Sequence, residues 1–322
     1  MKVTVIIPNY NGIEYLKECL KSLKAQTFRD FAVIVVDNCS TDGSPEYIKK
    51  YYPEIRVFKL DKNYGFSAAV NKGIQKSRTP YVILLNNDTV VHKNYMNELY
   101  NHINSSKKIF SVSSRMISYY NRGIIDDAGD LYSVTGWAFQ RGIGQPVENF
   151  NTPCRVFSAC AGAAIYRREV FKKIGLFDEM HFAYLEDIDM GYRARIEGYR
   201  NEYCPAAMVY HIGSATSGSK YNDFKVRLAA RNSVYLNYKN MPFLQLVINF
   251  LPLFAGTVVK AVFFQKKGYG NIYCRGILEG LKTAHNCRKV KFKWKNLINY
   301  IIIEEELIKN TFLYAKDFLA RH

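Results

Sequence analysis

The chain has 322 residues, a length that favours one large domain or two smaller ones. Hydrophobic residues make up 48% and charged residues 23%, which is ordinary globular composition and excludes disorder over the whole chain. The formal net charge is +17, so we expect a partner or substrate that carries negative charge.

The positive charge is concentrated toward the C-terminus. Residues 215–322 hold 18 of the 45 Lys and Arg residues but only 6 of the 28 Asp and Glu residues. The seven cysteines include no CxxC pair, which favours a reduced, cytoplasmic compartment over a disulfide framework. The apolar start of the chain is broken at Pro8, too early for a signal peptide.

Short apolar runs alternate with helical patterns over the first 90 residues. Helices are expected from Asn11, as an N-cap with Glu14 three residues on, and over residues 67–77. The apolar runs predict buried strands at residues 3–7, 31–36, 55–60 and 81–85. This rhythm predicts an α/β fold with an open, mainly parallel sheet and helices on both faces.

The pattern changes twice further along the chain. Residues 115–155 are polar and weakly periodic, and we expect long loops or a small hairpin there. A strand is expected at residues 161–166, helices at 168–174 and 186–197, and the end of a strand at 208–211. Long helices are expected from Asp223 onward.

Three of the apolar strands end in polar clusters. The clusters are Pro8-Asn9-Tyr10-Asn11, the run from Asp37 to Ser44, and Asn86-Asn87-Asp88. Ligands of parallel α/β sheets bind outside the carboxyl ends of the strands, so these clusters are expected to meet in space. Asp37 is placed to accept hydrogen bonds from a base or ribose, and Asp88 to hold a divalent cation. The alternative is that each cluster is only a turn.

Taken in order, these residues resemble glycosyltransferase family 2, most closely its rhamnosyltransferase-like members. The resemblance covers residues 3–215 well and the remainder loosely. Its motifs are Val5 to Asn11, Val36 to Ser44, Asn63-Tyr64-Gly65-Phe66, Leu84 to Asp88, Gly162 to Arg168, Gly175 to Glu179, Glu186-Asp187-Ile188-Asp189, and His211.

The resemblance implies a GT-A fold, a nucleotide-diphosphate sugar donor, Mg²⁺ or Mn²⁺, and inversion at the anomeric carbon. It assigns donor binding to Pro8, Asn9, Tyr10, Asp37, Asn63, Gly65, Asn87 and Asp88, and metal binding to Asp88 and His211. The chain departs from the family at Asn86-Asn87-Asp88, where the motif is named for two acids. This departure implies a metal held largely by the diphosphate and one or two side chains.

Glu186 and Asp187 fall on the catalytic acid pair of the family, with Asp187 as general base. A sugar hydroxyl is a poor nucleophile, so a carboxylate must take its proton during attack. The competing interpretation is that these acids only favour the start of a helix. Arg193 is expected to pair with an acid on its own helix. His211 is a metal or diphosphate contact, or a packed histidine.

The acceptor side of the site carries weaker signals. Trp137 is expected either to stack on an acceptor sugar or to anchor its own loop. Gly162 and Ala163 belong to the matching Gly162-to-Arg168 motif and are also assigned to the acceptor.

We divide the chain into a GT-A domain at residues 1–215 and a basic, apolar, membrane-associating helical region at residues 216–322. Residues 243–264 are long enough to cross a bilayer, but Asn249, Pro252 and Lys260 interrupt them. The basic residues that follow favour association with an anionic membrane on its cytoplasmic face. The alternatives are a solvated basic face or a homodimer interface. We expect no nucleic-acid partner, because no nucleic-acid motif is present.

The expected function is transfer of a sugar, with rhamnose as the first guess, from a dTDP- or UDP-sugar to a lipid-linked or cell-surface glycan. Two alternatives stay open. A non-catalytic glycan-binding paralogue fits Asn86 and Asn87 as remnants of a lost site. A sugar nucleotidyltransferase would need a Gly-rich basic loop after the first strand, which the sequence lacks.

Overall fold

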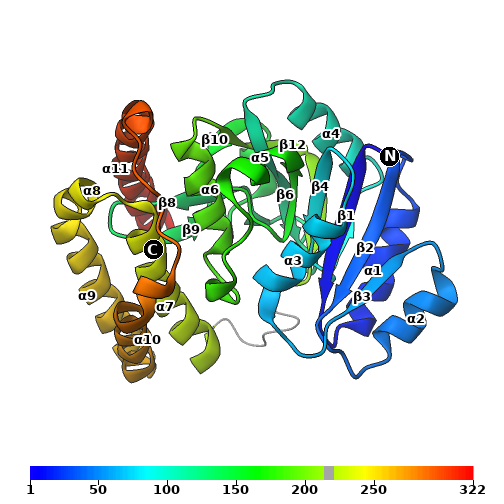
Figure 1. Cartoon of the computed structure of the whole chain (residues 1–322), viewed down its shortest axis with the longest axis horizontal. Helices are drawn as coiled ribbons and strands as arrows, with labels where there is room; N and C mark the ends of the chain where they lie inside the picture. Colours follow the sequence, from blue (N-terminus) through cyan, green and yellow to red (C-terminus); the bar gives the residue numbers. More distant parts are fainter. Residues whose placement is uncertain (214–220, 322) are drawn as a thin grey trace.

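A mainly parallel sheet forms the centre of the computed structural model, which describes residues 1–213 and 221–321 (Figure 1). Its principal strands lie in the order β10 (Cys154–Val156), β12 (Arg200–His211), β6 (Ile109–Ser118), β11 (Ala163–Arg167), β4 (Tyr81–Leu85), β1 (Val3–Asn9), β2 (Phe31–Asp37) and β3 (Arg56–Lys59). Strand β11 runs antiparallel to both β4 and β6. Short strands β5 (Thr89–Val91) and β7 (Ile125–Asp127) pair with β12 and β6.

Helices cover both faces of this sheet, as the sequence predicts. They are α1 (Ile13–Lys24), α2 (Ser44–Tyr51), α3 (Gly65–Lys76), α4 (Tyr95–Asn104), α5 (Arg168–Ile174) and α6 (Glu186–Ile196). On β1, Val5 and Ile7 pack with α1 and α4, whereas Ile6 packs with α3. This alternation follows from the two-residue repeat of a strand and gives two apolar cores, one on each face.

One local prediction needs correction. Asn11 does not cap α1: Gly12 holds the cap position, Asn11 has a positive φ, and its Oδ1 accepts from the Thr41 amide. The carboxylate of Asp42 instead accepts from the Ile13 amide. The small hairpin expected within residues 115–155 is present as β8 (Asp130–Tyr132) and β9 (Ala138–Gln140), and the same segment also contains the end of β6 and the strand β7.

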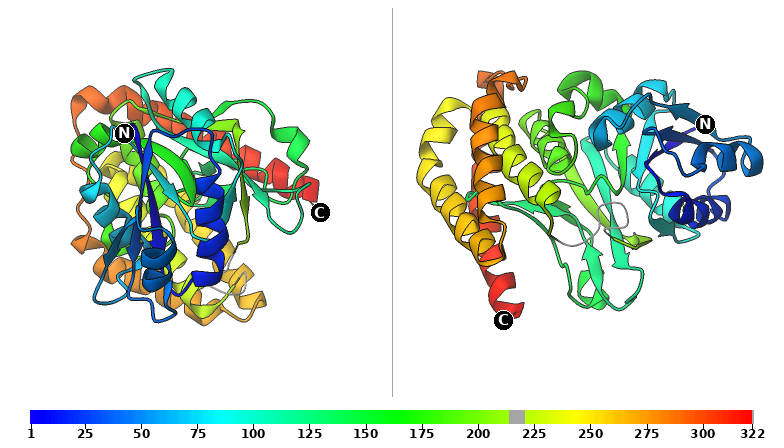
Figure 2. Two further views of the ribbon diagram at one scale, coloured as in Figure 1. Left: turned by 90° about the vertical axis from the view of Figure 1, so that its right-hand side faces the viewer. Right: turned by 90° about the horizontal axis from the view of Figure 1, so that it is seen from below.

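The C-terminal helices lie together beside the hairpin end of the sheet domain (Figures 1 and 2). They are α7 (Asp223–Asn240), α8 (Phe243–Ile248), α9 (Phe250–Lys266), α10 (Gly270–Thr283) and α11 (Leu297–Arg321). The Asn310 side chain of α11 donates to the carbonyl of Tyr132 in β8 at 2.9 Å. The helical region is therefore joined to the sheet domain by buried polar contacts.

The apolar stretch at residues 243–264 is divided between α8 and α9, which meet at Asn249. Pro252 falls in the first turn of α9, where its missing N–H costs little. Among the described residues, every helix is too short or too polar to span a bilayer.

Candidate active site

Asn9, Asp37 and Asn87 form the buried floor of the candidate site, at the carboxyl ends of β1, β2 and β4. The Asn87 side chain donates to Asn9 Oδ1 at 2.8 Å, and the Asn9 side chain donates to Asp37 Oδ1 at 3.0 Å. The other Asp37 oxygen accepts from the Ser40 amide at 3.0 Å. Polar clusters far apart in the chain therefore meet at one edge of the sheet.

This close packing requires a glycine at position 12. A Cβ at Gly12 would lie 2.2 Å from the Asn87 side-chain nitrogen. Any larger residue would therefore push Asn87 away from Asn9.

Gly65 fulfils a second backbone requirement at the start of α3. Its φ is +85°, and a Cβ there would lie 2.5 Å from the Phe182 carbonyl oxygen. The Asn63 side chain accepts from the Gly65 amide at 2.9 Å. Among the remaining donor-site candidates, Pro8 is partly exposed and Tyr10 is exposed.

Asp88, shortly after the end of β4, and His211, the last residue of β12, lie close together. His211 Nε2 is 3.4 Å from Asp88 Oδ1, and its Nδ1 is 2.7 Å from Asp126 Oδ2. Burial alone would lower the pKa of His211, but hydrogen bonds to Asp126 and Asp88 raise it to about 10. A carboxylate on the far nitrogen of a histidine is also the arrangement that orients metal-binding imidazoles.

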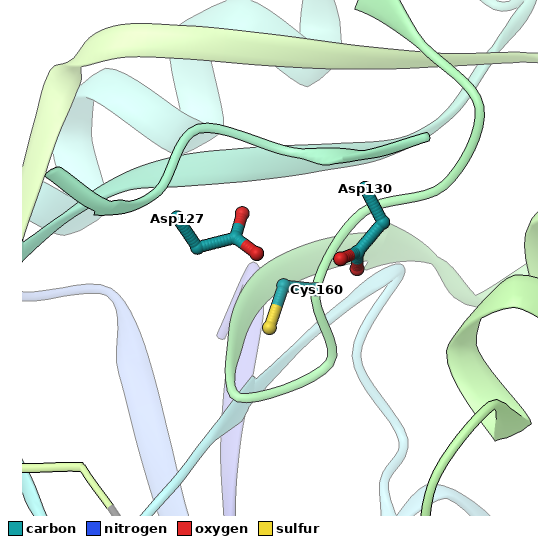
Figure 3. A group of neighbouring side chains, drawn as sticks. All are labelled: Asp127, Asp130 and Cys160. Carbon is teal, nitrogen blue, oxygen red and sulfur yellow. The ribbon is translucent and has the colours of Figure 1, made fainter. Parts of the chain in front are cut away.

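Two carboxyl groups and a thiol form a second cluster (Figure 3). Asp127, Asp130 and the Cys160 thiol bring their ligand atoms within 4.8 Å of one another. The Asp127, Asp130 and Asp187 carboxyl groups lie close enough to influence one another's ionisation. Burial and the neighbouring negative charges raise the pKa of Asp130 well above its usual value and that of Asp127 to about 7. These surroundings favour the protonated form of Asp130.

Asp187 itself is partly exposed, whereas Asp130 behind it is buried. Burial raises the pKa of Asp187, and backbone amides including that of Ile188 act in the opposite direction. Burial also raises the pKa of Glu186 to about 8, with a further contribution from the charge of Asp187. One Glu186 oxygen, Oε2, has no partner among the described residues. The pair therefore combines a partly exposed carboxyl group with a buried one.

The loop that leads into this acid pair has an unusual backbone. Phe182, Tyr184 and Leu185 all have φ between 62° and 71°, a region that residues other than glycine rarely adopt. Such conformations persist only where the surroundings enforce them, and they cluster at functional sites. The buried Asn232 side chain of α7 supplies that constraint, because it donates to the carbonyls of His181, Ala183 and Tyr184 at 2.8–2.9 Å.

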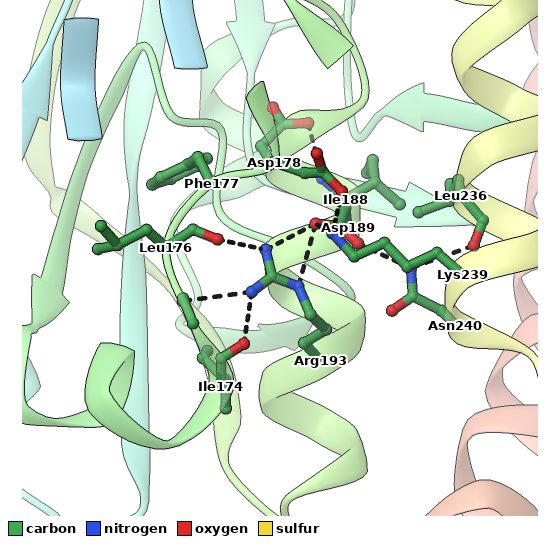
Figure 4. A network of polar contacts seen from close by, with 12 residues as sticks. Ile174, Leu176, Phe177, Asp178, Ile188, Asp189, Arg193, Leu236, Lys239 and Asn240 are labelled. Atoms are coloured by element: carbon green, nitrogen blue, oxygen red, sulfur yellow. Dashed lines mark hydrogen bonds and ion pairs between the residues drawn. The ribbon is translucent and has the colours of Figure 1, made fainter. Parts of the chain in front are cut away.

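Asp189, two residues beyond Asp187, has a structural role on another face of α6 (Figure 4). Its carboxylate accepts from Arg193 at 2.6 Å, from Lys239 at 3.0 Å and from Asn240 at 2.8 Å. Burial opposes ionisation, but Arg193 and Lys239 hold the pKa of Asp189 far below its usual value. The predicted pairing of Arg193 with an acid of its own helix is confirmed, and the network ties α6 to α7.

These contacts connect all the principal candidates. Asp37 reaches Asn87 through Asn9, and Asn87 precedes Asp88 in the chain. Asp88 pairs with His211, which contacts Asp126. The adjacent Asp127 reaches Asp187 through Asp130. Asp37, Asp88, Asp187 and His211 are therefore linked through three groups of contacts that the chain itself joins at residues 87–88 and 126–127, and we term this set the polar cluster.

The acceptor candidates are placed less uniformly. The Trp137 indole donates to the Gly256 carbonyl at 3.1 Å and packs edge-on against Tyr314, so it anchors its loop to the C-terminal helices. The Gly162 carbonyl accepts from the Asn86 amide at 2.8 Å, and the Ala163 side chain is fully buried in the core. Acceptor binding by these three residues stays a prediction.

A groove of about 690 Å³ lies beside the strained loop, between α7 and α10. Phe182 contributes to its wall, and Phe182 also packs against Gly65. The charged side chains in the groove are Asp223, Arg227, Arg231, Arg275 and Glu279. Arginine is suited to planar contacts with phosphate oxygens.

Sequence reasoning missed Asp126, Asp127, Asp130, Asn232 and this groove. The only signal for the three aspartates is their density, three acids within five residues around Gly129. Asn232 gives no signal, because an asparagine inside a helical pattern normally points to solvent.

Comparisons with known proteins agree with this geometry. A chain from Sinorhizobium fredii described as "Uncharacterized protein y4gI" is 28% identical over 67% of this chain, but the match spans only 25% of that relative's length. An N-acetylglucosaminyl-diphospho-decaprenol L-rhamnosyltransferase from Mycobacterium tuberculosis is 26% identical over 66% of this chain and 77% of its own length.

Solved structures show the same fold. The Mannosyltransferase PcManGT from Pyrobaculum calidifontis, in complex with GDP-Man and Mn²⁺, superposes with a TM-score of 0.56 at 14% identity. The match covers 88% of this chain and 87% of that one. GalNAc-T7 with UDP, GalNAc and Mn²⁺ superposes with a TM-score of 0.60 at 19% identity, over 74% of this chain and 47% of the other. The predicted α/β architecture of the GT-A type, with a C-terminal helical region, is confirmed.

The family model described as Glycosyl transferase family 2 matches residues 4–175, which include the strand ends that carry Asn9, Asp37 and Asp88. The matched segment is more than half of the chain, and the chain therefore belongs to glycosyltransferase family 2.

Proposed function

We propose that this glycosyltransferase is an inverting, metal-dependent enzyme that moves a sugar from a nucleotide-diphosphate donor to a hydroxyl of a lipid-linked or cell-surface glycan. The donor is a dTDP- or UDP-sugar, with dTDP-rhamnose as the first candidate. The observation that carries the proposal is the polar cluster from Asp37 to Asp187, with a partly exposed carboxylate at its end.

We assign donor binding to the side chains at the floor of the site. Asp37 is held by Asn9 and Ser40, in a position suited to the base or ribose of the nucleotide. Asp88 and His211 Nε2 lie 3.4 Å apart and would offer one carboxylate and one imidazole, a set that suits Mg²⁺ or Mn²⁺ when diphosphate oxygens complete the coordination. Metal binding there would require Nε2 of His211 to lose the proton that Asp88 stabilises. A metal bound there would neutralise negative charge on the departing diphosphate.

The transfer step uses Asp187. Its carboxylate takes the proton of the acceptor hydroxyl while that oxygen attacks the anomeric carbon. The bond from the anomeric carbon to the diphosphate oxygen breaks at the same time, and its electron pair leaves with the nucleoside diphosphate. The buried Asp130 carboxyl lies beside Asp187, and burial makes Asp187 a stronger base than an exposed aspartate.

The groove beside Phe182 supports an acceptor that carries phosphate near its reacting sugar. The named relative from Mycobacterium tuberculosis acts on a diphospho-decaprenol compound, which has this chemistry. Substitution of Arg275 by Ala is then expected to raise the KM for a phosphate-bearing acceptor and leave the KM for the donor unchanged.

A screen of nucleotide sugars tests the proposal. In the presence of Mg²⁺ or Mn²⁺, one donor is expected to raise the melting temperature, because a ligand that binds only the folded state stabilises it. Transfer from that donor to a lipid-linked glycan is then followed by the anomeric configuration of the product. A retained configuration would contradict inversion. A melting temperature that no nucleotide sugar changes would contradict the donor class.

The polar cluster also separates this proposal from its alternatives. A glycan-binding paralogue would not need a partly exposed carboxylate that lies beside Asp130 and follows a constrained loop. A nucleotidyltransferase would bind a sugar phosphate with a nucleoside triphosphate, and a melting-temperature rise with triphosphates but not with nucleotide sugars would favour it.

A further inference from the structure

The helices α8 and α9 have partly reversed polarity: several polar side chains face the protein and many apolar side chains are exposed, although Leu246, Leu253 and Phe264 pack inward. Gln245 of α8 and Asn249, at its C-terminal end, are buried and donate to Glu304 of α11 at 2.7 and 2.9 Å. On α9, Thr257 and Lys260 line a small internal cavity. An ordinary surface helix has the opposite arrangement, with its apolar stripe against the core.

The outward side chains form a continuous stripe, which we term the outer face. It consists of the exposed apolar side chains of α8 and α9 between Phe243 and Phe263. Phe243 is 79% exposed, Leu251 72% and Phe254 60%. Monomeric soluble proteins rarely expose contiguous apolar surface on this scale, so the outer face is expected to have an occupant.

Neighbouring helices extend this surface. Helix α11 runs beside α8, as the contacts of Glu304 show, and Ile301 and Ile308 are exposed one turn on either side of that contact. Trp294, just before α11, is 80% exposed. Tryptophan at the edge of an apolar surface is typical of the boundary between lipid and water.

The charge around the outer face identifies the occupant. Residues 224–303 contain a single acidic residue, Glu279. Of the three glutamates that follow, Glu304 accepts from Gln245 and Asn249 and Glu306 pairs with Arg195, whereas Glu305 is exposed. Exposed lysines follow the stripe at Lys266 and Lys267, and again at Lys291, Lys293 and Lys295. A second copy of the chain would bring an equally basic surface against this one, whereas an anionic bilayer supplies the opposite charge.

We propose that the outer face inserts into the interfacial layer of an anionic bilayer, with its lysine fringe on the lipid headgroups. The helices lie in the membrane surface rather than cross it, in keeping with the length and polarity of each described helix. This inference does not rest on the proposed sugar transfer, because it uses neither the cleft nor its carboxylates.

Sedimentation with lipid vesicles tests the inference on the full chain. The protein is expected to sediment with phosphatidylcholine vesicles that contain phosphatidylglycerol, and to bind pure phosphatidylcholine about tenfold more weakly. Added salt is expected to weaken binding to the anionic vesicles. Equal binding to both vesicle types, or no binding to the anionic ones, would overturn the inference.

Two variants and two matched controls locate the contact. Leu251→Glu with Phe254→Glu places charges on the outer face and is expected to reduce vesicle binding by about tenfold or more. Tyr51→Glu is the apolar control, since Tyr51 is 54% exposed on α2, at the opposite end of the molecule (Figure 1). Its vesicle binding and its melting temperature are expected to match those of the unaltered protein.

The charge fringe is tested with Lys266→Glu and Lys267→Glu together, against Lys49→Glu and Lys50→Glu on α2. Only the first pair is expected to lose anionic vesicle binding. If the outer-face variant sediments with vesicles as well as the Tyr51→Glu control does, the surface is wrong. If the outer face instead drives self-association that the variant abolishes, analytical ultracentrifugation will show a dimer, and the bilayer assignment is overturned.

Discussion

Asn232 provides the sharpest test of how the helical region controls the chemistry. Its side-chain amide donates to three carbonyls of the loop at residues 181–184, and this loop places Asp187 at the start of α6. Asn232→Ala removes the donor from these carbonyls, of which His181 keeps a second donor in Arg231. At about 1 kcal/mol for each lost hydrogen bond, the free energy of unfolding is expected to fall by about 2–4 kcal/mol.

The same change is expected to lower kcat more than it raises the KM for the donor. Asn232→Ala removes three contacts through which α7 holds this loop, although Arg231 and Phe224 of α7 still contact it. We expect the loop to relax around Tyr184 and Leu185, and Asp187 to shift. A displacement of about 1 Å at a catalytic group can reduce the rate by about a hundredfold. We therefore expect kcat to fall between about tenfold and a hundredfold at a temperature where the variant remains folded.

Asn237→Ala is the matched control. Asn237 lies on the same helix and accepts one hydrogen bond, from the Tyr132 hydroxyl, away from the loop. Its loss is expected to cost about 1 kcal/mol of stability and leave kcat unchanged. Chemical denaturation measures the stability of both variants, and transfer kinetics at saturating donor measure kcat. Equal kcat values for Asn232→Ala and Asn237→Ala would refute the positioning argument.

Three further predictions follow from buried groups. Asp189→Asn removes the buried carboxylate shared by Arg193 and Lys239, of which Lys239 keeps Asp178, and the free energy of unfolding is expected to fall by about 3–5 kcal/mol in urea denaturation; a loss below about 1 kcal/mol would contradict a buried ionic network. Glu186→Gln is expected to gain stability relative to the unaltered protein as the pH rises from about 5 to about 8. In the unaltered protein the folded state keeps Glu186 protonated over this range while the unfolded state releases the proton, so folding becomes less favourable as the pH rises. An equal dependence of the melting temperature on pH in both proteins would contradict the raised pKa. Gly12→Ala is expected to displace Asn87 and weaken donor binding by about tenfold in calorimetry while leaving the helix in place; unchanged donor affinity would show that this contact is not needed.

The sequence predicts the sheet because its central strands are unbroken apolar runs that end in polar clusters. Tyr81–Leu85 and Arg168–Ile174 begin and end where the sequence places them. Asn11 fails as a cap because a tertiary partner, Thr41, takes its side chain, and no local pattern reports such a partner.

The sequence predicts only part of the candidate site, for a similar reason. Asp88 and His211 follow strands and carry family motifs, whereas Asp126, Asp127 and Asp130 lie in a segment without periodicity. Their importance arises from a fold that brings them to His211 and Asp187. The sequence shows the apolar stretch at residues 243–264. Which of its side chains are exposed depends on how α8 and α9 pack against the rest of the protein, and this is a tertiary property.

The central claim is that donor binding at Asp88 and proton removal at Asp187 occur in one cleft through different groups. The most direct measurement compares Asp187→Asn with Asp88→Asn, using the melting-temperature shift with donor and metal alongside sugar transfer. Asp187→Asn is expected to keep the donor shift and lose transfer by at least about a hundredfold, whereas Asp88→Asn is expected to lose both. Transfer that survives in Asp187→Asn, or a donor shift that survives in Asp88→Asn, would contradict the account.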